Sequence, residues 1–262
     1  MQKYKEIFNQ IETTLRKVST LSAELFDSRF GEFKNYENQS LSDNEYFSRM
    51  VAIIFYSGFR AETVTKKLDT IVSHFPNYET VANYGENEIH QILSDPRMIQ
   101  NHKKIKACIK NAKIFKEIVS EYGSFNDYVK SFEPNNSFEN LMLFKEEIEY
   151  EFAFLGGITV YHFMMDIGLS VLKPDRVIAR IFKRLGLIEN EKQYLKTVIQ
   201  GRKFSHATGH PIRYIDIVFV KYGQKGEDEF FGLKDGICLE KNPKCMTCGV
   251  KDYCGYYADN SR

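Results

Sequence analysis

The sequence has no apolar segment long enough to cross a bilayer. Its longest apolar run, residues 50–59, is about half as long as the ~20 residues that a membrane-spanning helix needs. The first 18 residues also have no apolar core of the kind that marks a secretory signal peptide. We therefore expect a cytoplasmic protein with no membrane partner, in which thiols stay reduced.

An excess of charge of one sign is also missing. The net charge is only +1 at pH 7, so the composition alone does not indicate a nucleic-acid partner. The distribution is uneven, because residues 103–116 contain six lysines and no acid, and residues 173–225 contain twelve Lys and Arg against four acids. Two such stretches can build one phosphate-binding face. The alternative, which is commoner for charge runs, is a solvated helix face.

Cysteine is scarce, and four of the five cysteines lie within 17 residues near the C-terminus. Six, two and five residues separate these four, which are Cys238, Cys245, Cys248 and Cys254. Thiolates are soft ligands, and four of them in one loop can hold an iron–sulfur cluster or a zinc ion. The fifth, Cys108, falls on the apolar side of a predicted helix and is expected to be a buried small hydrophobe.

Apolar residues recur at helical spacing along most of the chain, and this periodicity predicts an all-α protein. The sequence contains no internal repeat and no low-complexity tract. The clearest predicted helices cover residues 2–18, 46–57, 78–93, 103–121 and 138–150. Residues 201–235 are the least clear, since their YIDIVFV run is compatible with either a buried helix or a short strand.

A glycine-bearing turn joins two predicted helices in the segment FLGGITVYHFMMDIG, residues 154–168. Such a hairpin can direct backbone N–H groups at a DNA phosphate from the N-terminus of its second helix. The residues that would do so here are Gly156, Gly157 and Thr159. By itself this signal is weak, because helix–Gly–helix turns are common in all-α proteins.

The order of these features resembles the helix-hairpin-helix DNA glycosylase superfamily, also called HhH-GPD. The cysteine spacing is similar to that of the branch with a 4Fe–4S cluster, to which endonuclease III and the adenine glycosylases belong. The string DRVIARIFKR, residues 175–184, resembles the catalytic segment of that superfamily. Residues 47–64 resemble the helix and turn that enter the duplex opposite the flipped nucleotide.

Other segments are similar to a second branch, the type I 3-methyladenine DNA glycosylases. These segments are residues 98–115, 123–132 and 154–169. That branch has no C-terminal cysteine loop, so the chain combines features of two branches.

The resemblance implies a two-lobed helix-hairpin-helix glycosylase fold with a C-terminal 4Fe–4S cluster loop. One expected domain is a helical barrel of residues 36–165 that ends in the hairpin. The other is a cluster domain of residues 1–35 plus 166–262, and the lesion pocket is expected in the cleft between the two.

The resemblance also implies that Asp175 is the catalytic aspartate and that the four clustered cysteines bind the 4Fe–4S cluster. A carboxylate close to the sugar stabilises the oxocarbenium-like transition state of base release and can orient water. The alternative role for Asp175 is helix N-capping, because it follows Pro174 at the start of a predicted helix. The two roles are compatible with each other.

Three departures from the family pattern bear on the reaction. Ile53 stands where type I enzymes and adenine glycosylases have a glutamate, and Thr159 replaces the second hairpin glycine. Tyr161 occupies the position of the lysine that bifunctional relatives use as an amine nucleophile. A phenol cannot form a Schiff base, so we expect an enzyme without AP-lyase activity. Lys173 is close to Asp175 in sequence but is expected to bind phosphate instead.

An apolar residue at position 53 favours an alkylated purine, because a base methylated at a ring nitrogen is already cationic and leaves without a general acid. Aromatic rings would hold such a base by cation–π attraction, although each ring also fits ordinary core packing. The expected pocket residues are Ile53, Phe55, Tyr56, Phe59, Tyr161 and His162. The expected DNA-binding residues outside the hairpin are Arg60, Lys173, Lys241 and Lys244.

We therefore predict a monomeric, nucleoid-associated, monofunctional DNA glycosylase. It would flip a damaged base, such as 3-methyladenine, out of double-stranded DNA and excise it hydrolytically in base excision repair. One alternative is a glycosylase for uracil, a mismatched pyrimidine or an oxidised base, which would need specific hydrogen-bond partners in the pocket. The other alternative is a non-catalytic iron–sulfur DNA-binding protein, against which the motif around Asp175 argues.

Overall fold

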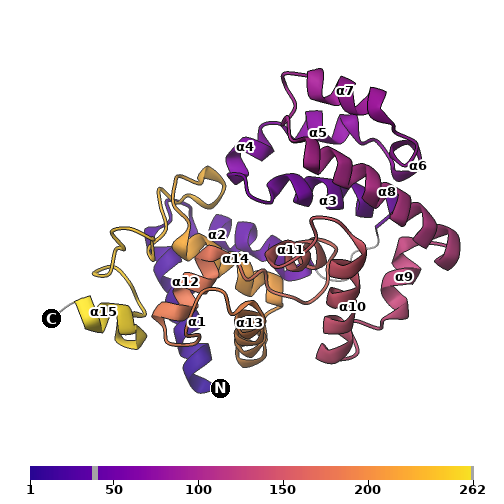
Figure 1. The fold of residues 1–262 in the computed structure, drawn as a ribbon. Helices are drawn as coiled ribbons and strands as arrows, with labels where there is room; N and C mark the ends of the chain where they lie inside the picture. The colour runs from indigo at the N-terminus through magenta and orange to yellow at the C-terminus, as the bar shows by residue number, and fades with distance from the viewer. Residues whose placement is uncertain (37–40, 261–262) are drawn as a thin grey trace. The chain divides into compact units, whose positions relative to one another are not determined.

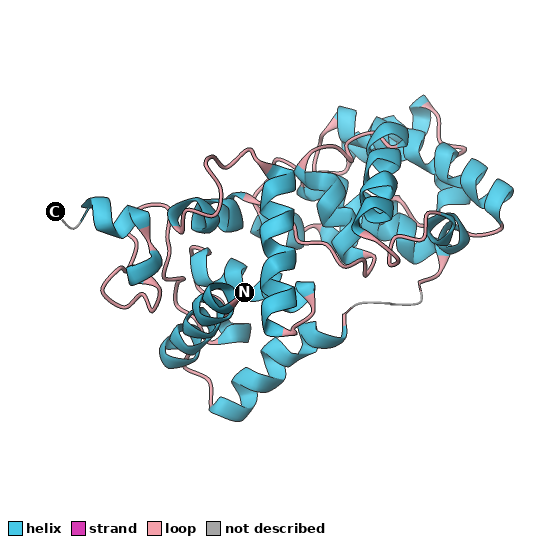
Figure 2. Cartoon of the chain, turned by 90° about the horizontal axis from the view of Figure 1, so that it is seen from below, coloured by secondary structure: helices cyan, strands magenta, loops and turns pink. Residues whose placement is uncertain are grey.

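The computed structural model describes residues 1–36 and 41–260, and these residues form helices and loops without any strand (Figure 2). An isolated bridge pairs Asp228 with Leu233. The predicted all-α class is therefore confirmed. No helix in the described part of the chain is both long and apolar enough to span a membrane.

The chain divides into two compact units. Unit 1 comprises Met1–Asn38 and Ser170–Arg262, and unit 2 comprises Gln39–Leu169. The domain borders expected from the sequence, 35/36 and 165/166, differ from these by three and four residues. Parts of the expected domains, residues 37–40 and 261–262, lie outside the described residues.

Unit 1 is built from helices at both ends of the chain (Figure 1). They are α1 (Gln2–Val18), α2 (Ala23–Gly31), η1 (Glu32–Asn35), α12 (Arg176–Arg184), α13 (Tyr194–Thr208), α14 (Ile212–Gly223), η2 (Glu229–Phe231), η3 (Lys251–Tyr253) and α15 (Gly255–Asn260). Helix α1 packs on α13 and α14, and α12 packs on α14. The rings of Phe182, Phe204 and Phe219 meet in this core, with centroids 4.8–5.4 Å apart. Aromatic packing of this kind fixes the position of α12 against α14.

The ambiguous YIDIVFV run is helical and lies within α14. Every residue from Tyr214 to Phe219 is buried, including one aspartate, Asp216. A helix that is buried on all sides has no polar face, so its sequence carries no amphipathic period that would distinguish it from a buried strand. The tertiary packing of unit 1 therefore decides between the two alternatives.

Unit 2 is built around the long helix α8 (Figure 1). Its helices are α3 (Asp43–Tyr56), α4 (Ala61–Thr65), α5 (Leu68–His74), α6 (Tyr78–Val81), α7 (Glu86–Ser94), α8 (His102–Tyr122), α9 (Phe125–Ser131), α10 (Phe138–Glu151) and α11 (Ile158–Asp166). Helix α8 packs against α3, α6, α7 and α9. The rings of Phe115 and Phe125 stack in this core with their centroids 4.4 Å apart. Cys108 is fully buried in α8, as predicted.

The single helix predicted over residues 78–93 is wrong, because two short helices, α6 and α7, cover this segment. Asn77 begins the first, and its side chain accepts a hydrogen bond from the Thr80 N–H at 2.7 Å. Gly85 begins the second, and its N–H donates to the Glu88 carboxylate at 2.7 Å. Each helix thus has its own start signal, although the helical spacing of the apolar residues continues across both helices.

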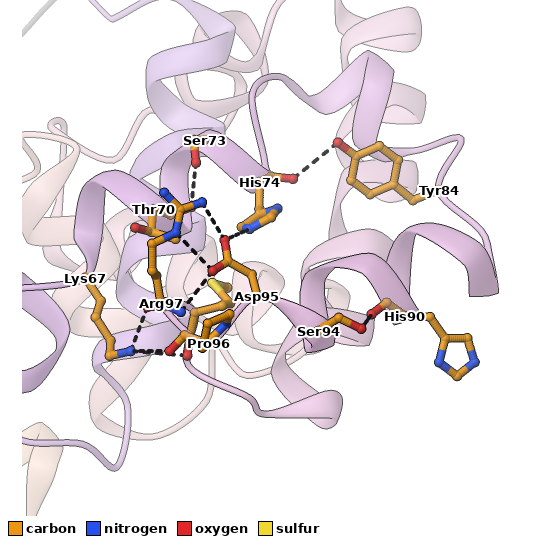
Figure 3. A network of polar contacts seen from close by, with 11 residues as sticks. Lys67, Thr70, Ser73, His74, Tyr84, His90, Ser94, Asp95, Pro96 and Arg97 are labelled. Carbon is orange, nitrogen blue, oxygen red and sulfur yellow. Dashed lines mark hydrogen bonds and ion pairs between the residues drawn. The ribbon is translucent and has the colours of Figure 1, made fainter.

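A polar network ties the turn between α7 and α8 to α5 (Figure 3). The Asp95 carboxylate lies 3.0 Å from His74 Nε2 and 2.9 Å from Arg97 Nη2. Lys67 Nζ donates to the Arg97 carbonyl at 2.6 Å. The guanidinium and backbone N–H of Arg97, followed by His74, hold the pKa of Asp95 well below its usual range. The network therefore favours the ionised form of this carboxyl.

We expect Asp95→Asn to lower the Tm at pH 7, because the amide loses the charge-assisted contacts of the network. A carboxyl whose pKa is depressed by folding contributes stability above its unfolded value of about 4 and loses it as the pH falls further. The Tm difference between variant and wild type should therefore shrink below about pH 4. Thermal unfolding between pH 2.5 and 7 measures this, with exposed Asp69→Asn as the control. A pH-independent difference would contradict it.

Candidate functional site

Asp175 is the N-cap of α12. Its Oδ1 accepts hydrogen bonds from the N–H groups of Val177 at 2.9 Å and Ile178 at 3.0 Å. Among the residues that the structure describes, neither a hydrogen bond nor an ion pair reaches Oδ2. The side chain is partly exposed. One oxygen therefore orients the carboxylate, and the other remains available to a substrate.

Three of the predicted pocket residues are buried inside unit 2. Ile53 is 1% exposed, Phe55 is fully buried and Tyr161 is 4% exposed. Phe55 and Tyr161 therefore pack in the core of unit 2. This is the alternative that the sequence left open for the aromatic rings. Their assignment to a base pocket stays a prediction.

The other three pocket candidates are more accessible and also belong to unit 2. Tyr56 and His162 are partly buried, and their ring centroids lie 6.3 Å apart. His162 Nε2 is 3.5 Å from the Asp166 carboxylate one turn further along α11. Phe59 is 40% exposed beyond the end of α3. The structure thus brings Tyr56 and His162 together at the contact between α3 and α11.

Tyr161 stands where the resemblance places the nucleophilic lysine, and the ammonium of Lys145 lies near its ring. Burial raises the pKa of the Tyr161 phenol, so it is neutral at physiological pH. The Lys145 ammonium lies 5.8 Å from the Tyr161 ring centroid and is paired with Glu149 and Glu146. Burial alone lowers the pKa of Lys145, but these two carboxylates raise it overall. A protonated amine has no lone pair with which to attack a sugar.

The hairpin turn is stabilised by a carboxylate from unit 2 itself. Gly157 has φ +60°, a conformation that favours glycine, and its N–H donates to Glu149 Oε1 at 2.9 Å. Thr159 Oγ1 lies 3.4 Å from Ser57 Oγ at the end of α3. A DNA phosphate that used the Gly157 amide would therefore have to displace Glu149, a competitor that the sequence did not indicate. The hairpin's role in DNA binding stays a prediction.

A buried amide, Asn111, holds the chain just before the hairpin. Its Nδ2 donates to the Ala153 carbonyl at 3.0 Å, and its Oδ1 accepts from the Ala153 N–H at 2.8 Å. The next residue, Phe154, has φ +65° and is 40% exposed. Bulky side chains rarely adopt this conformation, and such strain persists only where neighbours enforce it. In the sequence, Asn111 stands out as a polar residue on the apolar face of α8, but its role was not predicted from the sequence.

Lys104 is the second missed residue, and it closes the C-terminal end of α3. Its side chain is buried, and Nζ donates to the carbonyl oxygens of Ile54, Phe55 and Ser57. The rings of Phe59 and Phe154 lie 5.1 and 5.6 Å from the same ammonium. Burial lowers the pKa of Lys104 to about 8, so the group is still mostly charged at neutral pH.

We expect Lys104→Met to lower the free energy of unfolding by about 2–3 kcal/mol, because three carbonyl groups lose a charged donor. The matched control is Lys103→Met, since Lys103 is exposed on the same helix and should change stability by less than about 0.5 kcal/mol. Urea unfolding of both variants measures the difference. Equal losses in the two variants would contradict the assigned role of Lys104.

The predicted phosphate-binding side chains outside the hairpin are accessible to different extents. Arg60 is exposed and begins α4 in unit 2. In unit 1, Lys241 and Lys244 are exposed on the cysteine loop, and Lys173 is partly exposed. Lys244 Nζ donates to the Asp235 carbonyl at 3.3 Å, which holds one of the two loop lysines.

Helices of unit 1 anchor the cysteine loop at several points. The Cys238 N–H donates to the Tyr222 carbonyl in the last turn of α14, and the Tyr222 hydroxyl donates to Cys248 Sγ at 3.1 Å. Arg184 Nη1 donates to Cys238 Sγ at 3.3 Å. A Cβ atom at Gly249 would collide with Thr14 of α1, so glycine is required for this close approach.

All four clustered cysteines line one cavity of about 20 Å³. Arg184 and Lys251 line it too, and their positive charges would offset the negative charge of bound thiolates. Within residues 1–36 and 41–260, no three His, Cys, Asp or Glu side chains converge closely enough for a single metal ion. A zinc ion needs four sulfurs at about 2.3 Å, whereas a 4Fe–4S cluster takes each thiolate on a different iron. The four thiolates are a donor set that suits either a 4Fe–4S cluster or a zinc ion, and the cluster stays a prediction.

With this geometry defined, comparison with known proteins identifies the family. The model of the methyladenine glycosylase family matches residues 20–173, which is more than half of the chain. The chain therefore belongs to the methyladenine glycosylase family and is a DNA N-glycosylase. The predicted membership of the helix-hairpin-helix superfamily is confirmed. The match ends two residues before Asp175 and includes none of the four clustered cysteines.

Solved structures that are similar to this chain cover different lengths of it. A 3-methyladenine DNA glycosylase I from Staphylococcus aureus aligns with 59% of this chain and 91% of its own, at 19% identity and a TM-score of 0.46. The 8-oxoguanine DNA glycosylase of Thermotoga maritima aligns with 81% of this chain and 95% of its own, at 18% identity and TM-score 0.53. An 8-oxoguanine glycosylase/lyase from Methanocaldococcus jannaschii, solved with DNA that contains 8-oxoguanine, aligns with 84% and 95%, at 18% identity and TM-score 0.55.

Proposed function

We propose that this chain is a monomeric, monofunctional DNA glycosylase that excises an alkylated purine, such as 3-methyladenine, from double-stranded DNA in base excision repair. The observation that carries the proposal is the family match over residues 20–173. The buried apolar side chain of Ile53 supports the choice of base, because it cannot protonate a neutral leaving purine.

In this mechanism the lesion leaves the base stack and enters a pocket, at a cost of a few kcal/mol that damaged bases reduce. The C1′–N bond then breaks, and its electron pair goes to the base, which a methylated cationic ring accepts without a proton. Positive charge grows on the sugar, and the free Oδ2 of Asp175 stabilises it and orients the attacking water. The water oxygen bonds to C1′ and its proton passes to the Asp175 carboxylate, which leaves the free base and an abasic site.

The enzyme stops at the abasic site because the position of the nucleophilic lysine holds Tyr161. Lys145, which lies near that ring, is paired with carboxylates and stays protonated. Borohydride should therefore trap no covalent adduct between the enzyme and lesion DNA. A trapped adduct would show that an amine attacks the sugar and that the proposed monofunctional mechanism is wrong.

Cys238, Cys245, Cys248 and Cys254 are the residues that would hold a 4Fe–4S cluster. Such a cluster would supply structural order, not bond chemistry, because it would fix the loop that carries Lys241 and Lys244. These two exposed lysines would then contact DNA phosphates.

A panel of duplex oligonucleotides, each with one lesion, tests the substrate. We expect release of 3-methyladenine or another methylated purine, and no release of uracil, mismatched thymine or 8-oxoguanine. Release of an oxidised or deaminated base without release of methylated purines would overturn the assigned substrate. Release of no base from any duplex, combined with binding to lesion DNA, would favour a non-catalytic DNA-binding protein.

A further inference from the structure

A second buried carboxylate, Asp216, lies in unit 1 and has no role in the proposed reaction so far. It belongs to the apolar run of α14, and the residue is 2% exposed. Aspartate is almost never fully buried unless it is paired, because removing its charge from water is costly. The contacts that compensate for this cost connect Asp216 to the backbone close to Asp175.

Asp216 binds the backbone two residues before Asp175. Its Oδ1 accepts the N–H of Lys173 at 3.2 Å, across 43 positions of sequence. Pro174 follows and has a restricted φ angle, and the Asp175 N–H donates back to the Lys173 carbonyl at 2.8 Å. This short, stiff connection leaves little freedom between the hydrogen bond at Lys173 and the carboxylate of Asp175.

The other carboxylate oxygen of Asp216 is paired with Arg213, whose Nη1 lies 3.2 Å from Oδ2. The Arg213 guanidinium packs over Phe33 and Tyr36, with its central carbon 5.4 and 4.9 Å from the ring centroids. Burial raises the pKa of Asp216 to about 6; Arg213 opposes this effect, and the nearby negative charge of Asp175 adds to it. The two aspartates therefore interact electrostatically as well as through the chain.

We propose that Asp216 is a positioning residue for Asp175: its hydrogen bond to the Lys173 amide fixes the turn that presents the candidate catalytic carboxylate. The expected effect of Asp216 on the reaction rate rests on the proposed function, whereas its expected effect on the structure of the turn does not. Asp175 is then held from both sides, by Asp216 through Lys173 and by the Val177 and Ile178 amides. A displacement of about 1 Å at such a group can slow a reaction about a hundredfold.

Three variants separate positioning from stability. Asp216→Asn keeps an acceptor for the Lys173 amide, Asp216→Val removes it, and Arg213→Met breaks the ion pair but leaves the acceptor in place. In single-turnover assays on the duplex that wild type cleaves, we expect Asp216→Val to lose about a hundredfold in rate with unchanged lesion-DNA affinity. Asp216→Asn and Arg213→Met should stay within about threefold of wild type in the same assay.

Amide hydrogen exchange gives a readout that does not depend on activity. In Asp216→Val, protection should fall at Lys173, Val177 and Ile178 and remain at Phe182 in α12. Asp216→Asn should retain protection at all four. Unchanged protection at Val177 and Ile178 in Asp216→Val would overturn the inference whether or not the protein releases a base. A rate loss in Arg213→Met as large as in Asp216→Val would overturn it too, because loss of stability alone would then explain both.

Discussion

Asp175→Asn is expected to slow base release by about 10²–10³-fold while the fold and the affinity for lesion DNA are retained. Asparagine caps helices about as well as aspartate, so its side-chain oxygen can still accept the Val177 and Ile178 amides. What it lacks is the negative charge on the second oxygen, which would stabilise the positive sugar. Single-turnover release from the preferred lesion duplex measures the rate, and thermal unfolding measures the fold.

Asp175→Ala is the matched comparison, because it removes both the charge and the cap. It should be as slow as Asp175→Asn and should also lose about 1 kcal/mol of unfolding free energy. If Asp175→Asn released the base at the wild-type rate, Asp175 would be a helix cap alone and the proposed mechanism would be wrong.

Iron is expected in the protein at about four atoms per chain, with about four acid-labile sulfides, when it is purified without oxygen. Cys245→Ala should lose this iron, because it removes one of the four thiols that line the cavity. The loop with Lys241 and Lys244 would then lose its fixed position. The slope of log affinity against log salt for DNA binding should fall by about 1.8, as expected for two lost phosphate contacts.

Cys108→Ala provides the control for this experiment, since Cys108 is buried in α8 of unit 2. It should keep the full iron content and the wild-type salt dependence. A wild-type protein that binds one zinc ion and no iron would contradict the cluster. Equal iron loss in Cys108→Ala and Cys245→Ala would show that general destabilisation explains the loss.

The fold class and several helix starts could be predicted because they depend on local patterns. Helix α1 has the bounds predicted from its apolar period, and α10 begins at the predicted residue, Phe138. The division of residues 78–93 into α6 and α7 was missed, because a continuous apolar face masked the start signal at Gly85. The helical state of α14 could not be predicted, since a run that is buried on all sides has no polar face.

In the candidate site, too, some features could be predicted from the sequence and others could not. The sequence indicated Asp175 as both cap and candidate catalyst, and the structure confirms the cap. It did not indicate Glu149 at the hairpin amide or Lys104 at the end of α3, because their partners lie elsewhere in the chain. A charged residue within a helical pattern gives no sign of which distant backbone group it binds.

By itself, the sequence determined the all-α class, the set of four clustered thiols and the position of Asp175 at a helix start. These features follow from residue type and short-range spacing. Only the tertiary structure decided that Asp216 of α14 binds the turn before Asp175 and that Asn111 holds the chain before the hairpin. Both are buried polar groups whose hydrogen bonds join residues more than 40 positions apart, and only the folded chain brings such partners together.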